Sequence, residues 1–114
     1  MRAVLAGIAL TATAWLFAQD APQIFSGVIS DSECGLEHSV MKKQHHLAND
    51  RICTLDCCEK RKQDYVLADH TSGDVYQIDD QKAVRRFANR RVRILGTLEA
   101  ESGKIRLLKV EPSR

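Results

Sequence analysis

The chain has 114 residues, a length that fits one domain, and its 17 basic and 15 acidic residues give a formal net charge of +2. This near-balance provides no overall electrostatic attraction to nucleic acids or to anionic membrane surfaces. A domain of this size buries only about 60–65% of its unfolded surface. Its core is therefore small, and a disulfide or metal staple would add stability.

Residues 1–18 have the pattern of a secretory signal peptide. Arg2 supplies a positive start, and the uncharged run from Ala3 to Phe17 is shorter than the roughly 20 residues that span a bilayer. We expect cleavage after Ala18, although Leu16 is larger than the residue usually found at that position of a cleavage site. A retained N-terminal anchor is the alternative. Cleavage would leave a mature chain with a net charge of +1 and no transmembrane segment. We expect this mature protein to be periplasmic or secreted.

A flexible lead-in over 19–23 precedes a single domain expected over 24–112. Alternating apolar residues and turn signals predict strands over 24–30, 65–69, 75–78, 91–99 and 104–111. In the last strand the inward-facing pattern shifts from Leu107 to Leu108, which predicts a bulge or a sharp twist. Helices are expected from Asn49 or Asp50 to about Lys62, and over 81–88.

The order of these elements predicts a mainly β fold with short helices. Five short strands with a helix between the third and the fourth form the layout of an OB-fold, a small barrel. The segment 31–64, between the first two strands, holds all four cysteines and three of the four histidines. We therefore expect a five-stranded OB-fold-like barrel with a helical, Cys/His-containing insertion between strands one and two, where an OB-fold has a binding loop.

The four cysteines are Cys34, Cys53, Cys57 and Cys58. In an oxidising compartment an even number of cysteines indicates disulfides. A Cys57–Cys58 bridge would be strained, and a Cys53–Cys57 bridge within one helical turn fits disulfide geometry poorly. The favoured bridges therefore join Cys34 to the segment 53–58.

A zinc site is the alternative for the same residues. Cys34, His38, Cys53 and Cys57 offer a Cys3His ligand set of the types that zinc accepts. Their C-x3-H and C-x3-C spacings are wider than the C-x2-C of zinc knuckles.

Copper is a further metal candidate, because imidazole and thioether groups suit it. His38, Met41, His45 and His46 lie close together in the sequence. A solvated, histidine-rich surface loop explains the same pattern without a metal.

A basic run surrounds Phe87. It consists of Arg85, Arg86, Arg90, Arg91 and Arg93. OB-folds bind single-stranded nucleic acids through basic grooves and aromatic side chains. A run of charges is usually a solvated face, however, and export separates the domain from most nucleic acid. We therefore expect no nucleic-acid partner.

Catalytic motifs are not found in the sequence. It has no nucleophile elbow, no H-E-x-x-H helix and no phosphate-binding loop. The prediction is a binding module, not an enzyme.

Several short elements of the chain resemble a family of short exported bacterial proteins of uncharacterised function. These elements are D-S-x-C-G-x-x-H at 31–38, C-x-x-x-C at 53–57, Y-V-L at 65–67, G-x-V-Y at 73–76 and V-x-x-x-G-T-L at 92–98. The resemblance covers nearly all of the mature chain and implies export and an OB-like barrel. It implies no activity, and Cys58 and the His45-His46 pair lie outside its pattern.

Together these observations predict an exported binding module of unknown ligand, with its insertion tied by disulfides. A metal-binding periplasmic protein with zinc or copper is the first alternative. A structural or interaction protein of the cell envelope, bound to an envelope partner, is the second.

Overall fold

The computed structural model describes residues 3–9 and 21–114. Most of the expected signal peptide (1–18) and the beginning of the lead-in (19–23) lie outside the described residues. The strands are β1 (Gln23–Asp31), β2 (Tyr65–Asp69), β3 (Asp74–Ile78), β4 (Arg91–Leu98) and β5 (Lys104–Pro112). The helices are α1 (Ser39–His45), α2 (Asp50–Leu55), the π-helix η2 (Asp56–Lys60) and α3 (Gln81–Arg85). The prediction of a mainly β fold with five strands and short helices is confirmed.

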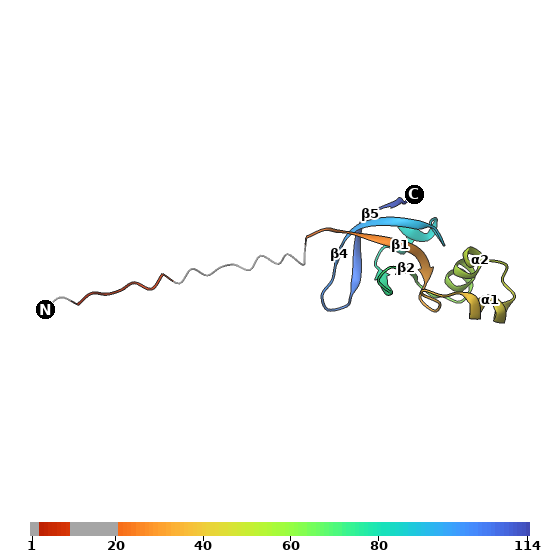
Figure 1. The fold of residues 1–114 in the computed structure, drawn as a ribbon, viewed down its shortest axis with the longest axis horizontal. Coiled ribbons are helices and arrows are strands. Elements are labelled where there is room, and N and C mark those ends of the chain that lie inside the picture. Colours follow the sequence, from red (N-terminus) through yellow and green to blue (C-terminus); the bar gives the residue numbers. More distant parts are fainter. Residues whose placement is uncertain (1–2, 10–20) are drawn as a thin grey trace.

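The five strands form one sheet whose pairings close on themselves in the order β1-β2-β3-β5-β4. β1 pairs with both β2 and β4, and all pairings are antiparallel except the short parallel one between β3 and β5. Figure 1 shows α1 and α2 together at one end of this sheet, beside the end of β1. The insertion between β1 and β2 therefore stands next to the sheet as a separate helical layer.

The core lies inside the sheet. Phe25, Gly27 and Ile29 of β1 are buried, as their alternation predicts, and they face Ile94 and Val92 of the adjoining β4. A Cβ on Gly27 would lie 2.5 Å from the carbonyl oxygen of a β2 residue. The close approach of β1 and β2 therefore requires glycine at this position.

A β-bulge interrupts the pairing of β4 with β5. Leu95 pairs with Lys109 and Gly96 with Leu107, so Leu108 has no partner in the register. Of the two irregularities predicted here the structure has the bulge, but the inward placement of Leu108 is wrong, because Leu108 is 57% exposed. The extra residue of the bulge is left out of the ladder, and Leu107 keeps its contact with the core.

The insertion has little apolar core of its own. None of the residues of α1 is buried, and α2 and η2 together bury only Cys53, Thr54 and Cys57. Asn49 caps α2 by accepting a hydrogen bond from the N–H of Ile52 at 2.9 Å. The single helix expected to Lys62 is instead α2 followed by the π-turn η2.

A candidate metal centre between the sheet and the insertion

The site begins where β1 ends. Asp31 is the last residue of β1, and its side chain is fully buried. Its Oδ1 accepts hydrogen bonds from the backbone N–H of Glu33 at 3.2 Å and of Cys34 at 2.8 Å. Gly35 follows with a φ of 59°, a left-handed conformation that glycine adopts easily. This tight turn holds the Cys34 side chain next to the Asp31 carboxylate.

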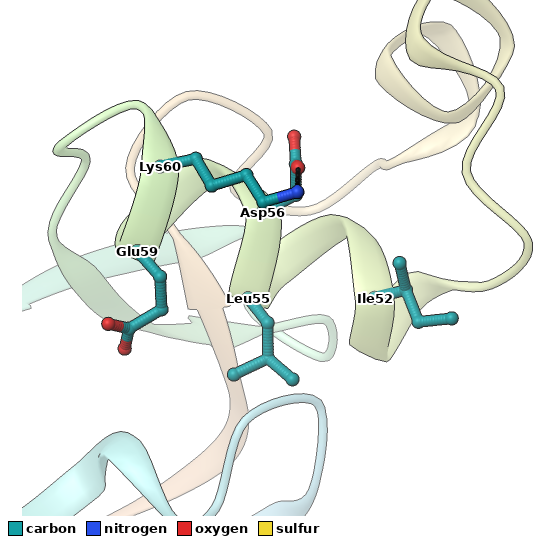
Figure 2. Close-up of a pocket in the computed structure, with 5 residues that line it drawn as sticks. All are labelled: Ile52, Leu55, Asp56, Glu59 and Lys60. Carbon is teal, nitrogen blue, oxygen red and sulfur yellow. Dashed lines mark ion pairs between the residues drawn. The ribbon is translucent and has the colours of Figure 1, made fainter.

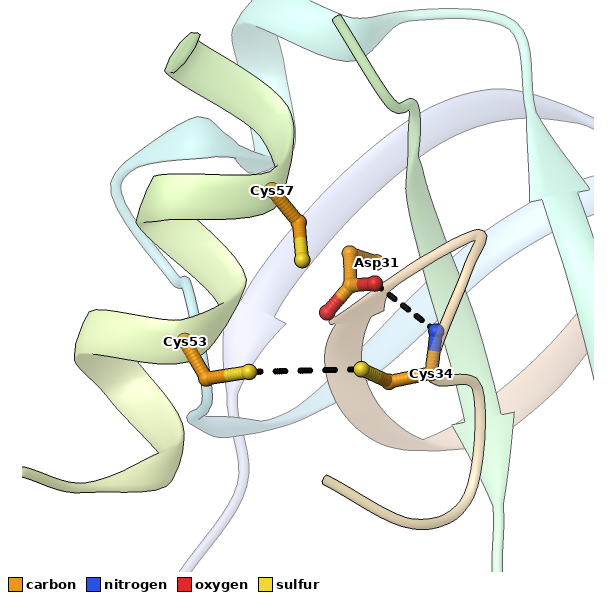
Figure 3. A group of neighbouring side chains, drawn as sticks. All are labelled: Asp31, Cys34, Cys53 and Cys57. Carbon is orange, nitrogen blue, oxygen red and sulfur yellow. Dashed lines mark hydrogen bonds between the residues drawn. The ribbon is translucent and has the colours of Figure 1, made fainter. Parts of the chain in front are cut away.

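The second half of the site comes from the helical segment. Cys53 in α2 and Cys57 in η2 are four residues apart, so both side chains lie on one face of the helix. Both are fully buried, and Figure 3 shows them directed toward Asp31 and Cys34. One ligand atom from each of the four residues lies within 4.8 Å of all the others.

The spacing of the sulfur atoms suits a shared ion. The Sγ atoms of Cys34 and Cys53 are 3.9 Å apart. Two thiolates bound tetrahedrally to zinc at about 2.3 Å lie roughly 3.8 Å from each other. A disulfide needs about 2.05 Å, and all four cysteines are free in the structure. The group Asp31, Cys34, Cys53 and Cys57 could therefore hold a metal ion.

Burial makes the cluster unfavourable for negative charge unless a cation is present. It raises the pKa of the Cys34 and Cys53 thiols, and it raises that of Cys57 to about 11. The negative charge of the Asp31 carboxylate also raises the pKa values of all three thiols. Without a cation the sulfurs carry protons at neutral pH. A metal ion would replace those protons, because it binds thiolates.

Two buried polar atoms at the site make no regular hydrogen bond among the described residues, but they are neighbours. The Asp31 Oδ2 atom lies 3.5 Å from the Nδ1 of His38, and the Cys57 thiol also contacts the Asp31 carboxylate. Buried carboxylate oxygens are nearly always satisfied. The Asp31 carboxylate is therefore a fourth possible metal ligand beside the three thiols, with His38 as its other close neighbour.

Arg61 supplies a positive charge at the edge of the cluster. Its Nη2 donates a hydrogen bond to the Sγ of Cys57 at 2.8 Å and lies 3.3 Å from Asp56 Oδ2. This contact lowers the pKa of Cys57 and partly opposes the effect of burial. Arg61 would thus compensate some of the charge of three thiolates and one carboxylate.

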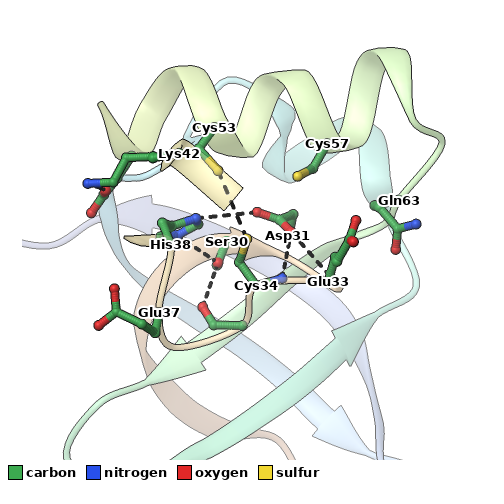
Figure 4. Close-up of polar contacts among 12 residues, drawn as sticks. Ser30, Asp31, Glu33, Cys34, Glu37, His38, Lys42, Cys53, Cys57 and Gln63 are labelled. Atoms are coloured by element: carbon green, nitrogen blue, oxygen red, sulfur yellow. Dashed lines mark hydrogen bonds and ion pairs between the residues drawn. The ribbon is translucent and has the colours of Figure 1, made fainter. Parts of the chain in front are cut away.

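His38 lies beside the ligand group and not in it. Its Nδ1 is 3.5 Å from Asp31 Oδ2, and its Nε2 is 3.1 Å from the hydroxyl of Ser30, as Figure 4 shows. Since the Ser30 hydroxyl donates its only proton to the Gly35 carbonyl at 2.6 Å, the His38 Nε2 must be the donor to Ser30. The expected Cys3His set therefore differs from the observed group, in which Asp31 replaces His38.

The other predicted ligands lie away from this group. Cys58 is partly buried against the sheet core and does not belong to the ligand group, and burial raises its pKa to about 12. Met41 is half-buried, and His45 and His46 are exposed near the end of α1. Neither Cys58 nor the two histidines join a metal-binding group of His, Cys, Asp or Glu side chains among the residues that the structure describes.

The basic run is largely engaged in contacts within the chain. Arg85 pairs with Glu59 at 2.8 Å, and Arg93 pairs with Glu111 at 2.9 Å. The guanidinium groups of Arg86 and Arg90 lie over the ring of Phe87, at 4.6 and 5.5 Å from its centre. Arg91 is exposed.

Two hollows lie near the candidate metal centre. A small pocket on the helical segment, shown in Figure 2, is lined by Ile52, Leu55, Asp56, Glu59 and Lys60 and has none of the cluster cysteines in its wall. A polar cavity of about 430 Å³ is lined by His38, His70 and Arg91 among others. Neither hollow opens onto the cluster sulfurs.

Sequence reasoning found the three thiols but missed Asp31. The signal was present as an aspartate three residues before a cysteine at a predicted strand end, since carboxylates also bind zinc.

Comparison of the chain with protein-family models, with curated proteins and with solved structures gives no match. No helix in the described part of the chain is long and apolar enough to cross a membrane.

Proposed function

We propose that this chain is an exported, OB-fold-like binding module in which one zinc ion fastens the insertion to the sheet. Asp31, Cys34, Cys53 and Cys57 are the proposed ligands. The observation that carries the proposal is the convergence of three thiols and one buried carboxylate within 4.8 Å.

The strand order supports an OB-fold. A five-stranded sheet that closes in the order β1-β2-β3-β5-β4, with a helix between β3 and β4, has the expected topology of that fold. The insertion then occupies the first connection, where OB-folds carry a variable loop.

The donor set favours zinc over copper. Zinc accepts thiolate, imidazole and carboxylate ligands in tetrahedral sites, whereas the soft Cu(I) ion favours sulfur alone. Four protein ligands leave no open position for water or substrate, which is typical of a structural site and not of a catalytic one. The proposal therefore assigns the ion a structural role.

A Cys34–Cys53 disulfide is the second candidate, supported by the 3.9 Å separation of their sulfur atoms. It would tie the same two segments together without a metal. In an exported protein it is chemically accessible.

Native mass spectrometry of the mature protein, purified without chelator, distinguishes the two candidates. We expect one zinc ion per chain and a polypeptide mass with all thiols reduced. A mass lower by two hydrogens without zinc would instead establish the disulfide and remove the zinc proposal.

Two cysteine variants assign the ligands. Cys53→Ser should lose zinc, because it removes one of four donors. Cys58→Ser is the matched control, since Cys58 lies in the same helical segment but outside the cluster. Equal loss of zinc in both variants would contradict the assigned ligand set.

A further inference from the structure

The four proposed ligands differ in their access to solvent. Cys34 lies on the turn after β1 and is half-buried, whereas Cys53, Cys57 and Asp31 are fully buried. Cys34 is therefore the ligand residue most accessible to an oxidant.

The partner of an oxidised Cys34 is also defined by geometry. The Sγ of Cys53 is in contact with it at 3.9 Å, and the Sγ of Cys57 also lies within 4.8 Å. The Sγ of Cys57 accepts a hydrogen bond from Arg61, which holds it in place. A bridge between Cys53 and Cys57 would have to close within one helical turn, where disulfide geometry is poor.

We propose that the zinc centre is a redox switch in which peroxide joins Cys34 to Cys53 as a disulfide and releases the ion. This inference rests on the proposed function of the same site. The inference adds a reaction that releases the zinc ion and identifies the two sulfur atoms that react.

The reaction is balanced with hydrogen peroxide as the oxidant. The Cys34 thiolate attacks one peroxide oxygen, so that an S–O bond forms, the O–O bond breaks and hydroxide leaves. The Cys53 thiolate then attacks the Cys34 sulfur, so that the S–S bond forms, the S–O bond breaks and a second hydroxide leaves. The two sulfurs lose two electrons in total, and the two peroxide oxygens gain them.

Release of the ion follows from the loss of ligands. Disulfide sulfur is a much poorer zinc ligand than thiolate. Asp31 and Cys57 would remain, and two protein ligands do not complete a tetrahedral zinc site. The Cys34 and Cys53 sulfurs need to approach each other by less than about 2 Å to bond, so the turn can close while the sheet stays folded.

The test uses the full mature protein, reduced and loaded with zinc. Hydrogen peroxide is added in the presence of a chromophoric zinc chelator, and samples are alkylated and analysed by mass spectrometry without reduction. We expect one zinc ion to be released for each disulfide formed, and reduction with dithiothreitol should restore zinc binding.

The position of the link needs fragmentation of one peptide. Cys53, Cys57 and Cys58 fall in a single tryptic peptide between Arg51 and Arg61, so alkylation marks the two that remain free. A link from Cys34 to Cys53 supports the proposal, and Cys58→Ser should behave like the natural protein. Zinc that stays bound, release without a disulfide, or a link from Cys34 to Cys57 or Cys58 would overturn it.

Failure of this inference is distinct from failure of the proposed function. A reduced protein that never binds zinc refutes the zinc site itself. A protein that binds zinc and keeps it under peroxide refutes only the switch.

Discussion

The sheet and the insertion are stabilised by different means. The sheet buries a continuous set of apolar side chains, including Ile29, Leu67 and Ile94. The insertion buries almost none, and α1 buries no residue at all. Its buried residues are His38, Cys53, Thr54 and Cys57, and the two cysteines point toward Asp31 at the end of β1. The comparison indicates that apolar packing folds the sheet, while the cluster positions the insertion.

The largest expected effect is on the sheet. Ile94→Ala should lower the free energy of unfolding by about 2–5 kcal/mol, because it leaves a cavity in the sheet core. Urea denaturation followed by circular dichroism measures the change. Leu108→Ala is the control: it removes an exposed side chain of the bulge and should cost no more than about 0.5 kcal/mol. Similar losses in the two variants would refute the described core.

The second effect separates the two regions. Removal of zinc by a chelator should accelerate amide hydrogen exchange over 32–60 and leave β2 and β4 unchanged. At a free zinc concentration of 100 to 1,000 times the dissociation constant, the stabilisation that is lost is about 2.7–4.1 kcal/mol. Exchange that rises equally in the sheet would mean that the ion stabilises the whole domain, and the contrast between the regions would be wrong.

A smaller effect is expected within the insertion. Asn49→Ala removes the side chain that caps α2 and should destabilise this helix by about 1 kcal/mol. The measurement is amide exchange at Ile52 and Cys53. Asn49→Asp, which keeps an accepting oxygen, should retain most of the protection, and a similar loss in that variant would argue against the cap.

The smallest effect concerns a contact that joins the two regions. The hydroxyl of Tyr65 in β2 donates a hydrogen bond to Glu59 in η2 at 2.7 Å, and burial together with this bond raises the pKa of Tyr65. The folded state holds the proton more tightly than the unfolded state, whose pKa is about 10. This contribution to stability is therefore complete below about pH 10 and is lost as the pH rises further.

Tyr65→Phe removes this titration. We expect it to cost about 1 kcal/mol or less at neutral pH, where only the hydrogen bond is lost. Above about pH 10 its stability should fall less steeply than that of the natural protein. Parallel unfolding curves of the two proteins across the alkaline range would show that Tyr65 does not link the regions in this way.

Most of the sheet was predictable from the sequence. The alternation in 91–98 and the turn at 70–73 are local signals, and the observed strands begin and end within a residue or so of the predicted ones. The position of the bulge could also be predicted, because the alternation of apolar residues changes register at Leu107 and Leu108. Which of the two leucines turns outward depends on the pairing with β4, which a single strand does not encode.

The candidate site was only partly predictable. The three cysteines could be predicted as ligands because thiols are typical metal ligands. Asp31, at the end of a strand, has the same local pattern as an aspartate that only forms a turn. Its role depends on the packing of α2 and η2 against the end of β1. The π-turn that carries Cys57 is likewise set by this packing, and no local signal predicts it.

The closing pair of the sheet has a consequence for the rate of folding. Gln23 at the start of β1 pairs with Gly96 in β4, across the insertion, a hairpin and α3. Closing so long a loop costs entropy before any contact is gained. Sheets dominated by such distant pairings fold in roughly milliseconds to seconds. The edge of β1 that pairs with β4 therefore stays unpaired until most of the chain has folded. During that interval its free backbone N–H and C=O groups can pair with a strand of another chain.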